Sequence, residues 1–96
     1  MNDFFTDLGG RWAKAARERG SEIEPPVLDS AVAFELLELA RVTAHSSERR
    51  FAPLSCYLAG IAVERVRAAR GELSDSEAAA HLNDVRQSLE SRSTLE

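Results

Sequence analysis

The segment DSAVAFELLELARVTAHSSERRFAPLSCYLAGIAVERVRAARG, residues 29–71, decides the fold class of this chain. Its apolar residues recur at the spacing of a helix face in two blocks, separated by the polar loop 46–52. Asp29 or Ser30 can cap the first helix. Pro53 suits the first position of the second helix, and Gly71 suits its end. The segment therefore predicts two helices, and Glu35 and Glu38 mark the solvated side of the first.

Helical patterns also lie on both sides of this segment. Residues 3–19 predict a helix that ends at Gly20, although Gly9 and Gly10 weaken it unless another helix approaches closely there. Ser74 and Glu77 have the spacing of a capping box, and they predict another helix with an apolar face. That face consists of Ala78, Leu82, Val85 and Leu89. We find no strand pattern and expect an all-α fold.

The length of 96 residues favours one hydrophobic core, so we expect a four-helix bundle-like single domain over residues 1–90. Residues 91–96 are expected to form a disordered tail. In the predicted third helix, the apolar residues are expected to make it the central helix of the bundle. They are Leu54, Tyr57, Leu58, Ile61, Ala62 and Val66.

Composition narrows the setting in which the chain works. Cys56 is the single cysteine, which excludes an internal disulfide and fits a reducing, cytoplasmic location. We see no secretory signal at the N-terminus and no apolar run long enough to cross a membrane. The predominance of Arg over the single Lys14 is typical of a GC-rich bacterial genome.

The net charge of −4 argues against a dedicated nucleic-acid binder. Charge alternates along the chain, with +1 over residues 1–20, −5 over 21–48, +4 over 49–70 and −4 over 71–96. Charge complementarity between helices is the simplest explanation. Arg65, Arg67 and Arg70 could form a basic strip that contacts nucleic acid. The strip lacks interleaved aromatic residues, however, and positive charge near a helix C-terminus also stabilises the helix itself.

The best candidate for a ligand site is the turn between the two central helices. His45, Ser46, Arg49 and Arg50 gather there beside a helix N-terminus, whose unpaired N–H groups and partial positive charge suit an anion such as phosphate. The alternative is that His45 interacts with the end of its own helix while both arginines are solvated or paired with Glu48.

Catalytic and metal-binding chemistry finds little support in the sequence. His45, Cys56 and His81 have no metal-binding spacing, and no catalytic triad is legible. Glu35 and Glu38 share a helix face, but carboxylates on a polar face are usually solvated. We therefore predict no catalytic residue, no metal site and no cofactor.

Aromatic residues indicate a different role. Phe34 lies near the polar side of its helix, and Phe51 follows the polar loop, so both are candidates for a partly exposed interaction surface. Such a surface would suit a homodimer or another protein partner.

The stretch from Leu36 to Ala62 resembles a small actinobacterial all-helical family of unassigned function. The resemblance rests on a helix ending in Ala-His, a basic loop, an Ala-Pro-Leu run and a helix of small residues. These are Ala44-His45, Arg49-Arg50, Ala52-Pro53-Leu54 and Leu58-Ala59-Gly60, and Trp12 in the aromatic opening is similar too.

Members of that family occur alone or appended to enzymes resembling the guanylyltransferase of molybdenum-cofactor synthesis. The resemblance implies an accessory role near molybdopterin nucleotides and carries no catalytic residues. It covers about residues 1–70, and the capped helix beyond looks like an extension. Together these observations predict a non-catalytic, self-associating interaction or accessory module, and the alternative is a small anion or nucleotide site at the turn.

Overall fold

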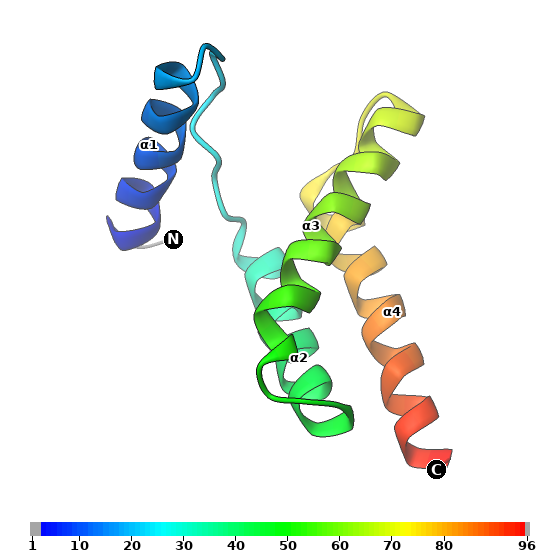
Figure 1. The fold of residues 1–96 in the computed structure, drawn as a ribbon. Helices are drawn as coiled ribbons and strands as arrows, with labels where there is room; N and C mark the ends of the chain where they lie inside the picture. Colours follow the sequence, from blue (N-terminus) through cyan, green and yellow to red (C-terminus); the bar gives the residue numbers. More distant parts are fainter. Residues whose placement is uncertain (1–2, 96) are drawn as a thin grey trace. The chain divides into compact units, whose positions relative to one another are not determined.

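The computed structural model describes the backbone of residues 3–95 and the side chains of residues 3–91. Four helices follow one another, α1 (Asp3–Glu18), α2 (Ser30–Ser46), α3 (Phe51–Arg70) and α4 (Asp75–Leu95), and the described residues contain no strand (Figure 1). The predicted all-α class with four helices is confirmed. The chain divides into two compact units, residues 1–30 and 31–96.

The first unit consists of α1 and the extended connector that follows it. Gly9 is buried, and a Cβ atom at this position would overlap the backbone carbonyl oxygen of Pro26. Gly10, its neighbour, has open space around it. The close approach expected at this glycine pair therefore exists, but the connector makes it rather than a helix. Gly9 is needed because only a residue without a side chain leaves room for the connector backbone.

The second unit contains α2, α3 and α4. One core cluster consists of Val63 of α3 with Ala78 and Leu82 of α4, and partly buried apolar residues pack around it. These are Val32, Leu36, Ala59 and Leu73. Leu39 and Val42 of α2 are buried as well.

Polar contacts join α2 to α3 beside this core. Thr43 donates a hydrogen bond to the Ser55 hydroxyl at 3.1 Å, and the Cys56 thiol donates to the Leu36 carbonyl at 3.6 Å. Cys56 is partly buried, as expected for a small apolar residue. Burial raises the pKa of its thiol, which keeps it protonated and unreactive.

The ends of α3 and α4 follow the local signals in the sequence. Gly71 adopts the left-handed conformation, with φ of 91°, and its N–H donates to the Arg67 carbonyl at 2.8 Å. Ser74 and Glu77 form the predicted capping box, in which each side chain accepts a hydrogen bond from the other residue's backbone N–H at 3.1 Å. The capping-box prediction is confirmed.

Two boundaries differ from the prediction. Helix α3 begins at Phe51, so Pro53 lies within the first turn rather than at its first position. Proline is tolerated throughout that turn because its missing N–H would have no helical partner there. Helix α4 continues to Leu95, so the predicted disordered tail is helical as far as that residue, and Glu96 lies outside the described residues. No Gly or Pro follows Glu90 to end the helix.

Candidate interaction surface

The outward face of α3 is apolar and exposed. Leu54, Tyr57 and Leu58 expose 64%, 74% and 66% of their surface. Their spacing of three and four residues places them on one side of the helix, together with the partly buried Ile61. We call these four residues the α3 stripe.

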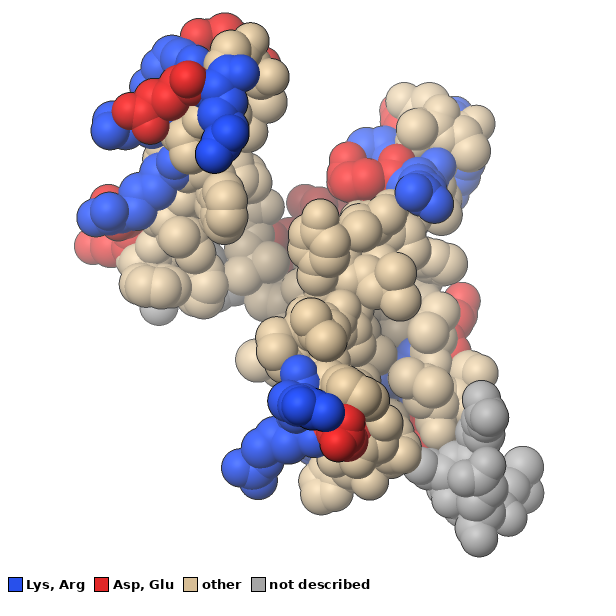
Figure 2. Space-filling model, viewed as in Figure 1, with Lys and Arg blue, Asp and Glu red and all other residues tan. Residues whose placement is uncertain are grey.

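No charged residue interrupts this part of the helix. The sequence of α3 carries no Asp, Glu, Lys or Arg from Phe51 to Val63. Figure 2 shows the same feature in space, because uncharged atoms cover the middle of α3 and charged groups gather towards its two ends. An exposed helix face ordinarily carries charged or polar residues, so the α3 stripe is unusual for a surface that meets only water.

The two predicted surface aromatics lie on different helices of the second unit. Phe34 of α2 is exposed, and so is its neighbour Leu37. Phe51, at the start of α3, is exposed to a lesser degree and lies under the guanidinium of Arg50, 5.8 Å from the ring centroid. This distance is within the range of a cation–π contact.

Sequence reasoning assigned Leu54, Tyr57 and Leu58 to the core, and this assignment is wrong. Only Val63 of α3 is buried, because the second unit supplies neighbours for one side of the helix only. A signal for this outcome was present in the sequence. A helix that is apolar around most of its circumference needs partners on all sides, and a chain this short has few helices to offer.

The residues of the proposed anion site lie together in the turn between α2 and α3, and all four are exposed. The Ser46 hydroxyl donates to the Val42 carbonyl at 2.7 Å, and Arg50 pairs with Glu48 at 3.4 Å. Among the described residues, the side chains of His45 and Arg49 form no hydrogen bond or ion pair that would fix them towards a common point.

The backbone at this helix N-terminus is largely engaged. The N–H groups of Phe51 and Ala52 donate to the carbonyls of Glu48 and Arg49 at 2.9 and 3.1 Å, and Pro53 has no N–H. An anion site of this type depends on unpaired N–H groups. The site at His45, Ser46, Arg49 and Arg50 stays a prediction.

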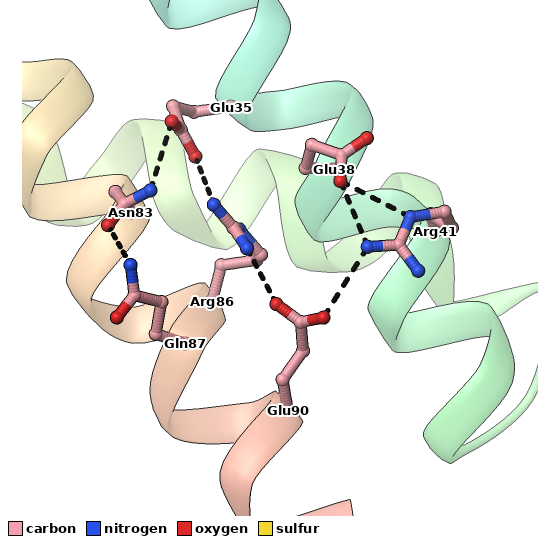
Figure 3. A network of polar contacts seen from close by, with 7 residues as sticks. All are labelled: Glu35, Glu38, Arg41, Asn83, Arg86, Gln87 and Glu90. Atoms are coloured by element: carbon pink, nitrogen blue, oxygen red, sulfur yellow. Dashed lines mark hydrogen bonds and ion pairs between the residues drawn. The ribbon is translucent and has the colours of Figure 1, made fainter.

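The carboxylates expected on a solvated face have a different environment. Glu35 and Glu38 of α2 face α4, where Glu35 accepts hydrogen bonds from Asn83 and Arg86 (Figure 3). The prediction that they mark the solvated side of α2 is therefore wrong for Glu35, whose side chain is mostly buried. The charged residues on this face of α2 indicated exposure to water, and the sequence pattern does not show that charged and amide side chains of α4 pack against them.

Residues 3–91 contain no cluster of three or more His, Cys, Asp or Glu side chains that could hold a metal ion. No helix in the part of the chain that the structure describes is both long and apolar enough to cross a bilayer.

Comparison with known proteins gives one match. No curated protein and no solved structure matches the sequence. A protein-family model described as a domain of unknown function (DUF6457) matches residues 7–94. The match extends through α4, so the interpretation of the capped helix as an addition to the family pattern is wrong. Helix α4 supplies Ala78 and Leu82, two of the three buried residues in the core cluster with Val63, which explains why it belongs to the domain. With nearly its whole length matched, the chain belongs to the DUF6457 family.

Proposed function

We propose that this chain is a non-catalytic helical interaction module that associates with a second copy of itself through the α3 stripe. The observation that carries the proposal is the run of exposed apolar side chains on a helix segment without charge. Burial of such side chains is the main driving force of protein association.

The size of the stripe sets the strength we expect. The exposures of Leu54, Tyr57 and Leu58 leave on the order of 400 Å² of surface for a partner, against about 800 Å² per partner in a standard interface. Two copies that pair their stripes about a two-fold axis would cover both at once. The expected complex is therefore weak and concentration-dependent.

The test is the oligomeric state of the full chain, measured by sedimentation equilibrium over about a hundredfold range of protein concentration. We expect a monomer–dimer equilibrium in the parent and a monomer in the double variant Leu54→Ser/Leu58→Ser. The matched control is Val85→Ser, which alters an exposed apolar residue on α4 and should leave association unchanged.

Two results would contradict the proposal. One is a parent that stays monomeric across the whole concentration range, and the other is equal association in the stripe variant. Substitution of Phe34 or Phe51 by Ser tests whether the interface extends beyond the stripe.

A separate experiment, thermal unfolding with and without added ligand, tests the alternative of an anion or nucleotide site, and with it a role near the molybdenum cofactor. Phosphate, molybdate or a guanine nucleotide should then raise the unfolding midpoint of the parent, but not of an Arg49→Ala/Arg50→Ala variant.

A further inference from the structure

Helix α4 is held to its neighbours in two different ways along its length. Its first half packs through Ala78 and Leu82, which are almost fully buried against Val63 of α3. Its second half, residues 83–91, is attached to α2 by charged and amide side chains, while Val85 remains half exposed. We call residues 83–91 the α4 strap.

The contacts of the strap form a continuous network between α4 and α2 (Figure 3). Arg86 reaches Glu35 of α2 at 3.4 Å and Glu90 of its own helix at 2.6 Å. Glu90 in turn lies 3.5 Å from Arg41 of α2, which also pairs with Glu38 at 2.9 Å. Asn83 adds a hydrogen bond to Glu35 at 3.1 Å.

The ion pairs that join the two helices are longer than those within one helix. Arg86–Glu35 and Arg41–Glu90 measure 3.4 and 3.5 Å, whereas Arg86–Glu90 and Arg41–Glu38 measure 2.6 and 2.9 Å. The short pairs stay intact if the strap moves away from α2, because both partners move together. Of the polar contacts described above, separation therefore breaks the two long pairs and the Asn83 hydrogen bond.

Burial makes the closed strap costly to maintain. The side chains of Arg86 and Glu35 are only 15% and 13% exposed, and the Arg86 Nε atom is buried without a hydrogen-bond partner among the described residues. Removing charges from water offsets much of the attraction between them. The balance between opening and closing is therefore sensitive to anything that weakens the remaining attraction.

The side of α2 that faces the strap also carries a buried apolar residue. Val42 lies seven residues after Glu35 and four after Glu38, which places it on the same face of α2 as the carboxylates that meet α4. Val42 is only 3% exposed. We therefore expect displacement of the strap to increase the exposure of Val42.

We propose that the α4 strap is a releasable cover on α2, held closed by the long ion pairs Arg86–Glu35 and Arg41–Glu90, and that rising ionic strength opens it while the first half of α4 stays packed. Salt screens the half-exposed Arg41–Glu90 pair most strongly and the buried Arg86–Glu35 pair much less, so it removes part of the attraction that closes the strap. It does not weaken the apolar contacts of Ala78 and Leu82. The inference is independent of the α3 stripe.

The test is amide hydrogen exchange of the full chain, followed peptide by peptide at low salt and at about 1 M NaCl, where the screening length falls to about 3 Å. Once released from α2, the end of α4 is a short helix without tertiary support, and such a helix is only marginally stable in water. We therefore expect protection in residues 83–91 to fall at least about tenfold at high salt, with residues 76–82 unchanged.

The matched control is the double variant Glu35→Leu/Arg86→Met, which replaces the central ion pair by apolar side chains of similar length. Its residues 83–91 should keep their protection at both salt concentrations, and unchanged protection of residues 76–82 shows that it is folded. Three results would overturn the inference. They are unchanged protection of residues 83–91 in the parent at high salt, an equal loss of protection in both halves of α4, and a loss of protection in the control as large as in the parent.

Discussion

Arg86 and Glu35 lie 51 positions apart in the sequence, yet their side chains meet at 3.4 Å and both are largely buried between α4 and α2. Each carries a full charge that water no longer solvates well, so each depends on the other. The C-terminal part of the domain is thus held by a cation and an anion that no local pattern connects.

Substitution of one member of this pair should be worse than substitution of both. We expect Arg86→Met to lower the thermal unfolding midpoint, because the Glu35 carboxylate would stay buried with Asn83 as its remaining partner. The double variant Glu35→Leu/Arg86→Met should recover most of the loss. Thermal unfolding of the parent, both single variants and the double variant measures the coupling between Arg86 and Glu35. Strictly additive effects of the two substitutions would contradict this expectation.

Acid should destabilise the second unit. The pKa of Glu90 is lowered by its hydrogen bond with Arg86, and that of Glu77 by its capping hydrogen bond with Ser74. A carboxyl group whose pKa is lower in the folded than in the unfolded state contributes stability above its unfolded pKa and loses it as the pH falls. We therefore expect stability to fall as the pH drops below the ordinary value of 4.5 and through the folded-state pKa values.

Denaturant unfolding at a series of pH values measures this effect. The variant Glu77→Gln should show a weaker loss of stability in the acid range, since it removes one of the two groups. Equal acid sensitivity in the variant and the parent would mean that Glu77 does not contribute.

The two adjacent glycines of α1 should respond in opposite ways to alanine. Gly10→Ala should stabilise the helix by about 0.5–1 kcal/mol, because the site is open and alanine favours helix. Gly9→Ala should loosen the connector from α1, because the new Cβ would overlap the Pro26 carbonyl oxygen. Amide exchange of residues 3–18 measures both effects, and similar behaviour of the two variants would contradict the close approach.

The small core of the second unit should depend strongly on one leucine. Leu82→Ala is expected to destabilise the domain by about 2–4 kcal/mol, since it opens a cavity beside Val63 and Ala78. The control is Val85→Ala, three residues further along α4, where the side chain is half exposed and the loss should be well under half as large. Urea unfolding followed by circular dichroism checks both.

The local features of the fold were predictable because they depend on neighbours in the sequence. The capping box needs only Ser74 and Glu77, three positions apart, and the end of α3 needs only a residue that tolerates the conformation of Gly71. The start of α3 and the length of α4 were less well predicted. Proline is tolerated anywhere in the first turn, so Pro53 does not identify the first residue of α3. No helix-ending residue marks the end of α4 before Leu95.

The α3 stripe was not among the site residues predicted from the sequence. Phe34 and Phe51 are exposed as an interaction surface requires, and the α3 stripe contains apolar residues that sequence reasoning recognised but assigned to the core. Helical periodicity shows that Leu54, Tyr57 and Leu58 share a face, but it does not predict whether another helix covers that face.

The sequence by itself determined four helices, the end of α3 at Gly71, the capping box of α4 and the spacing of the apolar residues, because hydrogen bonding and side-chain periodicity within a helix are local. The tertiary structure alone decided which faces are covered. It buried Glu35 against Arg86, left the α3 stripe open and placed the Pro26 backbone over Gly9. These outcomes depend on contacts between residues distant in the chain, and a helix can present the same apolar or charged face to water, to a neighbour or to a partner.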